Sequence, residues 1–239
     1  PIDVGIRVEL NRKFFDPVTD IVYDPKFVFR TSRHNDRVRT FCTNPGGRVR
    51  MEDYDAFKLV NGDALSERKT GNTNFALINT VTLTEPFSDT TAFGQMIAKQ
   101  FFLLGGGRPI VQRVGDFREG RRSSAVTFLS RTRHFEQCQA TLKATPGDIT
   151  LGLPGRIVDN LWESLKKIDK IVPGVLHPST LLYAPEIKFF DTHFLTDEHL
   201  ETNISGLFVA GDGTGKSRGI VGAAISGLIA ARGIAGKYF

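Results

Sequence analysis

The order of apolar and polar residues in the first third of the chain predicts β-strands that pair antiparallel. Residues 4–9, 26–31 and 38–43 alternate between apolar and polar side chains, as a strand with one buried face does. The longer run 75–84 is rich in β-branched and apolar residues and predicts a central strand. The dipeptide Asp16-Pro17 predicts a turn after the first strand.

Two segments follow the spacing of amphipathic helices. In 90–104 the apolar residues recur every three or four positions, and the run ends at three glycines, 105–107. Because these glycines follow the helix, they predict its C-terminal cap and not a phosphate loop. A second helix is expected at 155–172, and the strand pattern returns at 181–190.

The C-terminal stretch combines a compact apolar run, a glycine-rich loop and a helix of small residues. The run 206–210 predicts a buried strand, and the loop 211–215, GDGTG, is too rich in glycine to continue it. The helix is expected to start at Gly219-Ile220. A strand, a glycine loop and a helix start bring backbone N–H groups and partial positive charge close to a nucleotide cofactor.

Two cofactors suit this arrangement. Gly215-Lys216-Ser217 ends like the phosphate-binding P-loop of ATP- and GTP-binding proteins. Its position is unfavourable, because a P-loop normally follows the first strand of its domain, and no strand follows here to supply a magnesium-binding Asp. For a flavin dinucleotide, Asp212 would instead accept a hydrogen bond from a ribityl hydroxyl. The helix start would then face the pyrophosphate or the flavin O2 edge.

A second candidate segment is the stretch 39–49, RTFCTNPGGRV. Its pattern predicts a strand, a Pro-Gly-Gly turn and a returning strand. The paired glycines Gly46 and Gly47 would let the backbone approach a flavin or substrate, and an ordinary hairpin turn is the alternative. Arg39, Cys42 and Asn44 are the best candidates for lining the substrate side, although a lone cysteine is often a small buried apolar residue.

Both segments resemble those of a flavoprotein family. The order GLFVAGDGTG, then GIVGAA, is similar to the last FAD-contacting segment of glutathione-reductase-type flavoproteins, above all the large FAD-dependent dehydrogenases of microbes. In that family a segment like FCTNPGGRV precedes an Asn-Gly pair and an Asn-x-Asn motif, here Asn61-Gly62 and 72–74. The segment 109–117, PIVQRVGDF, is similar as well. Asn44 stands where the family has a second cysteine, so a dithiol role would be lost.

The resemblance implies an α+β fold derived from an α/β parent. Residues 1–190 would be an inserted substrate or cap domain, with a mixed, largely antiparallel sheet and two helices. Residues 191–239 would supply the last strand and helix of a three-layer FAD-binding domain. The G-x-G-x-x-G unit that holds ADP in such proteins does not occur in this sequence, so we expect a C-terminal portion whose partner is the missing N-terminal FAD-binding half.

The implied activity is that of an FAD-dependent oxidoreductase, inactive as a fragment alone, which transfers hydride between a small-molecule substrate and FAD, with NAD(P)H as a candidate electron donor. The resemblance and the loop geometry assign FAD binding to Gly211, Asp212, Gly213, Gly215, Gly219 and Ile220, together with Gly46 and Gly47. The catalytic candidates are Arg39, Cys42 and Asn44. No metal site is expected, because the histidines lack ligand spacing.

Composition limits the remaining possibilities. The chain of 239 residues is 40% apolar and 24% charged, typical of a soluble globular protein, and its two cysteines indicate a reducing cytoplasm. No apolar stretch approaches the ~20 residues of a membrane span, so no membrane partner is expected. The net charge of +5, with basic groups at 118–122 and 131–133, leaves open a non-catalytic module that binds nucleic acid or a protein partner. No nucleic-acid-binding motif supports that alternative.

Overall fold

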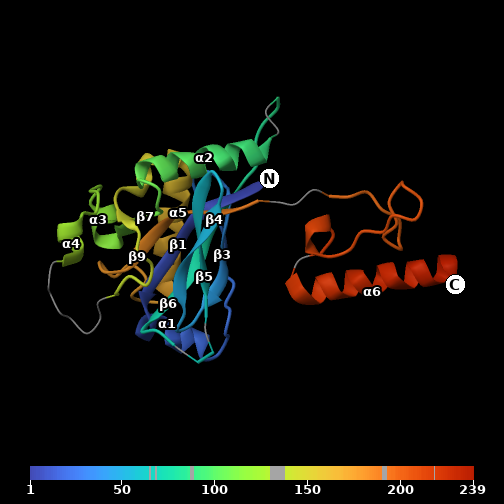
Figure 1. The fold of residues 1–239 in the computed structure, drawn as a ribbon. Helices are drawn as coiled ribbons and strands as arrows, with labels where there is room; N and C mark the ends of the chain where they lie inside the picture. The colour runs from blue at the N-terminus through green and yellow to red at the C-terminus, as the bar shows by residue number, and fades with distance from the viewer. Residues whose placement is uncertain (65, 68, 87–88, 130–137, 190–192, 218) are drawn as a thin grey trace. The chain divides into compact units, whose positions relative to one another are not determined.

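The computed structural model describes residues 1–239 with the exception of 65, 68, 87–88, 130–137, 190–192 and 218. The chain divides into two compact units, Pro1–Phe189 and Phe190–Phe239 (Figure 1). The basic segment 131–133, one of the two that leave a nucleic-acid partner open, lies outside the described residues.

The first unit is built on a mixed sheet of seven strands. In chain order its elements are β1 (Ile2–Asn11), α1 (Arg12–Thr19), β2 (Val28–Arg30), β3 (Arg37–Asn44), β4 (Arg48–Tyr54), β5 (Phe57–Asp63), β6 (Asn72–Val81), α2 (Thr90–Leu104), β7 (Ile110–Arg113), α3 (Val114–Arg118), α4 (Ala125–Leu129), β8 (Thr145–Pro146), η1 (Ile149–Leu151), α5 (Gly155–Ile171) and β9 (Leu181–Lys188). The sheet order is β2-β3-β6-β1-β9-β7-β8, and every neighbouring pair is antiparallel except β7 and β8. The α+β class with a largely antiparallel sheet is therefore confirmed.

The central strand β1 has one apolar and one charged face, and both faces are buried. Val4 and Ile6 are no more than 1% exposed and join the main apolar core, to which α2 and α5 also contribute (Figure 1). Arg7 and Glu9 point to the opposite face and are fully buried as well. Charged groups are costly to bury without partners, so this second face is where a polar site is expected.

Two long helices occur where the helical spacing predicts them. α2 begins after Asp89, whose carboxylate accepts a hydrogen bond from the Ala92 N–H at 2.8 Å. It ends at Gly105, whose N–H bonds to the Phe101 carbonyl at 2.8 Å, which confirms the glycine run as a helix stop. α5 covers the second predicted segment. The short helices α1, α3 and α4 are not predicted by the pattern, and α1 runs through the turn expected at Asp16-Pro17.

The strand that returns after the Pro-Gly-Gly turn does not pair as a simple hairpin would. β4 pairs with β5 along its whole length, starting with Arg48 opposite Asp63, in a separate two-stranded sheet. β3 is paired with β6 on one edge, and on its other edge the Thr43 N–H donates to the Asp24 carboxylate at 2.9 Å. With both edges of β3 occupied, the chain leaves the main sheet. The pattern does not predict β5.

The second unit contains the short helix η2 (Asp212–Thr214) and the long helix α6 (Gly219–Tyr238). The structure does not form the buried strand expected at 206–210. This segment makes a single bridge, between Glu201 and Phe208, and all of it is partly or fully exposed. The described part of this unit contains no sheet that the segment could join, so its backbone groups bond locally or face water.

By length and composition alone, α6 could cross a membrane. It has 20 residues and a mean hydropathy of 1.5 over its most apolar window, of which 17% is buried. The expectation that no apolar stretch reaches this length is therefore wrong, because small residues continue the helix to Tyr238. A single helix with these properties does not identify a membrane protein.

Hydrogen bonds and an ion pair connect the turn between β2 and β3 to α5. Glu163 accepts hydrogen bonds from the Ser32 N–H and hydroxyl, both at 2.8 Å, and pairs with Lys167 at 2.7 Å. Lys167 also donates to the Arg30 carbonyl at 2.9 Å. These contacts, of which the bond from Lys167 is the strongest, lower the pKa of the Glu163 carboxyl to about 2.

We predict that Glu163→Gln destabilises the protein in a pH-dependent way. The folded-state pKa lies below the ordinary value of 4.5, so the carboxylate contributes stability above pH 4.5 and loses it as the pH falls toward 2. At pH 7 the loss should be about 1 kcal/mol or less, because the contact is near the surface. Urea denaturation should show a difference from the parent that shrinks between pH 7 and pH 3. A difference that is independent of pH would contradict this role; Glu198→Gln, at an exposed position, is the control.

Candidate functional site

Cys42 has a strained backbone conformation in β3. Its φ angle is 49°, in the left-handed region that residues other than glycine rarely adopt. The pairing of β3 with β6 shifts register between Phe41 and Asn44, so Cys42 lies at an irregularity of the strand. Strain of this kind persists only where the surroundings impose it, and it is concentrated at functional sites.

Three side chains impose this conformation. The Cys42 carbonyl accepts hydrogen bonds from the Arg7 guanidinium at 2.9 Å and from the Asn44 amide at 3.0 Å. The N–H of the next residue, Thr43, donates to Asp24. The Cys42 side chain remains partly exposed, with its sulfur 3.8 Å from the Asn44 amide nitrogen. The structure thus brings the predicted candidates Cys42 and Asn44 together.

The ion pair between Arg7 and Glu186 lies at the centre of this site. Both side chains are fully buried, and the guanidinium binds the carboxylate through Nε at 2.7 Å and Nη2 at 2.5 Å. Arg7 also donates to the amide oxygens of Asn61 at 2.9 Å and Asn74 at 3.3 Å. Lys188 Nζ lies 3.3 Å from Glu186 Oε1 and adds a second positive charge beside this carboxylate. The guanidinium thus binds Glu186 through two N–H groups and uses its remaining N–H groups on other acceptors. A buried ion pair needs this geometry to offset the cost of removing its charges from water.

Residues of the Asn-Gly and Asn-x-Asn motifs therefore lie close to Cys42 in the folded chain. The Asn44 amide donates to the Asn74 side-chain oxygen at 3.2 Å. A Cβ on Gly62 would lie 2.1 Å from that same oxygen and 2.8 Å from Arg7 Nη1. Glycine is required at this position because the polar network fills the space that a side chain would need.

The paired glycines of the turn allow close packing within the protein. Gly46 has a φ angle of 62°, and a Cβ on Gly47 would lie 2.3 Å from the Asp63 carbonyl oxygen and 2.7 Å from the Asn44 Cβ. The close approach that the sequence predicts for this turn is thus made to β5. The approach of Gly46 and Gly47 to a flavin stays a prediction.

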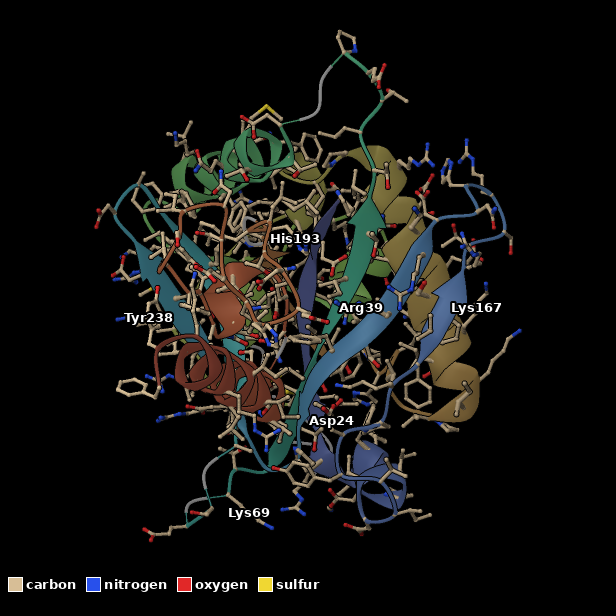
Figure 2. The ribbon with its side chains drawn as sticks, turned by 90° about the vertical axis from the view of Figure 1, so that its right-hand side faces the viewer. Asp24, Arg39, Lys69, Lys167, His193 and Tyr238 are labelled. Carbon is tan, nitrogen blue, oxygen red and sulfur yellow. The ribbon has the colours of Figure 1, made fainter. Side chains whose placement is uncertain are left out.

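Arg39 lies on the same face of the sheet in a separate set of contacts. Figure 2 places it beside β3, on the face turned toward the viewer. Its guanidinium pairs with Asp3 at 2.7 Å and lies 5.0 Å from the centre of the Phe41 ring, with Lys26 Nζ 5.3 Å from that ring. Among the described residues no hydrogen bond joins Arg39 to Cys42, so the structure does not bring these two candidates into direct contact.

A second buried polar cluster surrounds Glu9, also on β1. Its carboxyl accepts hydrogen bonds from the Tyr183 hydroxyl at 2.7 Å, the Asn72 amide at 3.0 Å and the Thr141 N–H at 3.2 Å. Burial raises the pKa of Glu9 in spite of these donors, and it also raises the pKa of Tyr183 and of the Cys138 thiol. A buried thiol with a raised pKa is a poor nucleophile, which leaves Cys42 as the accessible cysteine.

Sequence reasoning missed Arg7, Glu9 and Glu186. The available signal was the presence of charged residues between apolar neighbours in two strand-forming runs, IDVGIRVELN and LLYAPEIK. Charges between apolar neighbours on a central strand need partners, so they mark a polar network or a site.

In the second unit the Asp212 carboxylate binds the start of α6. Its Oδ1 accepts a hydrogen bond from the Gly219 N–H at 3.0 Å. Gly211, Gly215 and Gly219 have φ angles of 98°, 71° and 81°, so the loop conformation depends on glycine. A Cβ at Gly211, Gly213 or Gly219 would meet no atom within 4 Å, so the backbone is open at these points. The binding of FAD by this loop and by the exposed Ile220 stays a prediction.

The fold and the polar site define an α+β domain whose sheet carries a buried ion pair and a strained cysteine. The chain belongs to the family described as FAD-dependent protein, C-terminal domain-like, whose model matches residues 1–188. It is also 27% identical over 231 residues to a protein of Clostridium beijerinckii described as an uncharacterized protein, in an alignment that covers 90% of this chain and 41% of that protein. The chain thus spans about two fifths of the length of this curated relative. The family indicates a flavoprotein context, as the resemblance in the sequence implies.

Gly62→Ala should destabilise the protein strongly, because the added methyl group would displace the side chains of Asn74 and Arg7 from a buried charged network. We expect a loss of about 2 kcal/mol or more. Gly71→Ala is the matched control, since a Cβ there meets nothing within 4 Å, and its effect should stay within about 0.5 kcal/mol. Urea denaturation measures both, and equal stabilities of the two variants would show that the network does not constrain residue 62.

Substitutions of Cys42 should separate backbone strain from side-chain function. Glycine adopts positive φ angles without strain, so Cys42→Gly should leave the fold as stable as the parent or stabilise it by up to about 1 kcal/mol. The β-branched variant Cys42→Val should destabilise it by more than about 1 kcal/mol. Thermal denaturation provides the measurement. If the glycine variant proves the less stable of the two, the conformation at residue 42 is not strained.

Proposed function

We propose that this chain forms the substrate-facing part of an FAD-dependent oxidoreductase, together with one segment of the FAD site. The observation that carries the proposal is the strained Cys42, held by Arg7 and Asn44 where the motif residues of a flavoprotein family converge. Glycine would be the more stable residue at such a φ angle, so the presence of cysteine supports a role for its side chain.

In this proposal Cys42 and Asn44 contact the substrate. The thiol is partly exposed. Both N–H groups of the Asn44 amide bind the Cys42 carbonyl and Asn74, so Asn44 would orient a polar group of the substrate through its side-chain oxygen. Arg39, whose guanidinium pairs with Asp3, lies on the same face of the sheet beside the Phe41 ring and would line the substrate side. The pair formed by Arg7 and Glu186 holds the Cys42 peptide in place from below and does not itself touch substrate.

The glycine loop of the second unit suits the tail of FAD. Gly211 and Gly213 leave the backbone open to close approach. Among the described residues Asp212 Oδ2 makes no hydrogen bond, so it could accept one from a ribityl hydroxyl. When bound, FAD would supply the ring that exchanges hydride with substrate, and we propose NAD(P)H as the electron donor. The activity would require the whole protein and not this chain alone.

The P-loop alternative has less support. The Gly219 N–H, which a phosphate at the helix start would need, is bound by the Asp212 carboxylate. A phosphate held there would lie beside this negative charge. A hydroxyl donor, by contrast, is favoured by a carboxylate, which supports the flavin tail over a nucleoside triphosphate near Lys216.

The purified full-length protein tests the proposal. We expect flavin absorbance in the near-ultraviolet and blue, and Asp212→Ala should weaken FAD binding at least about tenfold, since a hydrogen bond to a charged acceptor is lost. Lys216→Ala should change FAD affinity less than about twofold, whereas loss of ATP binding in that variant would support the P-loop. A colourless full-length protein that does not take up added FAD would refute the flavin assignment.

A further inference from the structure

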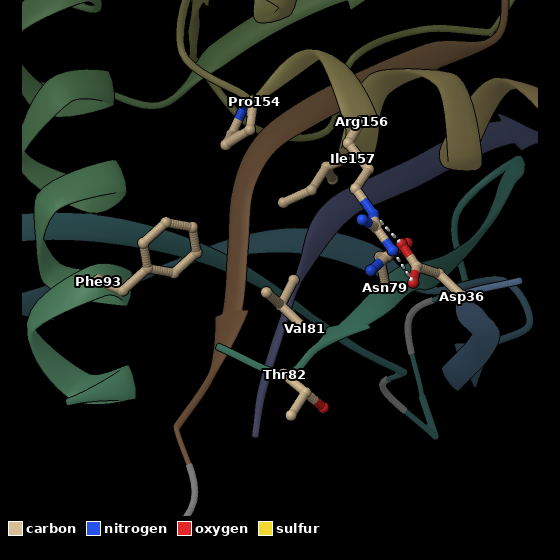
Figure 3. A pocket seen from close by; sticks show the side chains of 8 residues that line it. All are labelled: Asp36, Asn79, Val81, Thr82, Phe93, Pro154, Arg156 and Ile157. Carbon is tan, nitrogen blue, oxygen red and sulfur yellow. Dashed lines mark hydrogen bonds and ion pairs between the residues drawn. The ribbon is translucent and has the colours of Figure 1, made fainter. Parts of the chain in front are cut away.

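A cavity of about 190 Å³ lies apart from the Cys42 site, between β6, α2 and the start of α5 (Figure 3). Its walls are largely apolar and come from Val81, Phe93, Pro154 and Ile157. Figure 3 shows Val81, Phe93 and Ile157 reaching toward the same space from three different elements. The cavity is smaller than the roughly 300–1,000 Å³ of drug-sized ligand pockets, so it suits a compact molecule.

One end of the cavity is polar but has no net charge. Arg156 binds the Asp36 carboxylate through Nε and Nη2, both at 2.7 Å, as the dashed lines in Figure 3 show. The hydrogen bond from Arg156 lowers the pKa of Asp36, so the pair stays ionised at neutral pH. The amide of the buried Asn160 donates to Asp36 at 2.7 Å and to Asn79 at 2.8 Å. These bonds fix the polar end in one arrangement.

Hydrogen-bonding capacity remains at this end. In the part of the chain that the structure describes, the Asn79 amide oxygen accepts one bond, from Asn160, and its nitrogen donates one, to the Thr80 carbonyl at 3.1 Å. A primary amide offers two acceptor sites and two donors, so one of each remains. Within the described part of the chain, Arg156 Nη1 makes no hydrogen bond and adds further donors. A complementary ligand must therefore offer both an acceptor and a donor.

We propose that this cavity binds a small neutral ligand with a compact apolar or aromatic body and a primary carboxamide head. The body would pack between Phe93 and Ile157, and the head would pair with the Asn79 amide beside Arg156. A carboxylate head could accept from Arg156 Nη1, but it would lie beside the Asp36 carboxylate and has no donor for the Asn79 oxygen. An ammonium head would face the Arg156 guanidinium and has no acceptor for the Asn79 nitrogen. Both charged heads are therefore disfavoured. The cavity shares no lining residue with the Cys42 network.

Benzamide is the probe for this site, with benzoate and benzylamine as head-group controls. Each is titrated into the 239-residue chain and followed by calorimetry and by the backbone amide signals of Phe93 and Ile157. We expect saturable binding of benzamide that shifts both signals, and at least about tenfold weaker binding of the two charged analogues. Absence of saturable benzamide binding, or tighter binding of benzoate, would overturn the proposal.

Two variants in the cavity and one control on α2 test where the ligand binds. Val81→Phe would fill the cavity with a ring and should abolish benzamide binding, whereas Thr91→Phe puts the same ring on an exposed position of α2 and should leave it unchanged. Thr82→Phe, at the exposed edge of the cavity, should weaken binding at least about fivefold without a change in unfolding temperature, which covers the case in which Val81→Phe does not fold. Full affinity in Thr82→Phe and in a folded Val81→Phe protein would place the ligand elsewhere and refute the assignment.

Discussion

The buried contact between Arg7 and Glu186 is the interaction on which the polar face of the main sheet depends. It joins β1 to β9, and through Asn61 and Asn74 the same guanidinium reaches β5 and β6. Removing one partner of such a pair strands a charge at a cost of about 3–5 kcal/mol, but replacing the pair by well-packed apolar residues is often neutral or stabilising. Stability alone therefore does not account for an arginine here. Its planar fork does, because one group can bind a carboxylate, two amides and the Cys42 carbonyl at once.

This network is strong enough to hold Cys42 in its unusual conformation. A left-handed conformation costs a residue other than glycine roughly 1–2 kcal/mol. A hydrogen bond from a charged donor contributes about 1.5–3 kcal/mol, and the Cys42 carbonyl receives one from Arg7 and a second, neutral one from Asn44. The stabilisation thus exceeds the strain. The buried ion pair fixes the backbone, and the backbone fixes where the partly exposed thiol lies.

The parts of the fold that depend on neighbours along the chain could be predicted from the sequence. The helix that ends at Gly105 carries its own signals in periodicity and caps, and β2 and β3 carry theirs in the alternation of apolar and polar residues. The ion pair could not be predicted, because its members are 179 positions apart and meet only through the strand order. The run 206–210 has the composition of a buried strand, yet a strand needs a sheet to join, and composition does not say whether one is present.

The helix α6 exposes apolar side chains, and Ile220 is 90% exposed. The contacts of the helix indicate what kind of surface would cover these side chains. An irregular segment of the same unit lies along the helix: the Gly211 N–H binds the Ser226 hydroxyl at 2.8 Å near its start, and Glu201 pairs with Lys237 in its last turn. In a bilayer, irregular chain exposed to lipid would leave backbone groups without partners, at several kcal/mol each. This argues for protein, not lipid, as the cover of the helix. Exposed apolar residues along one helix are typical of a surface that packs against other protein.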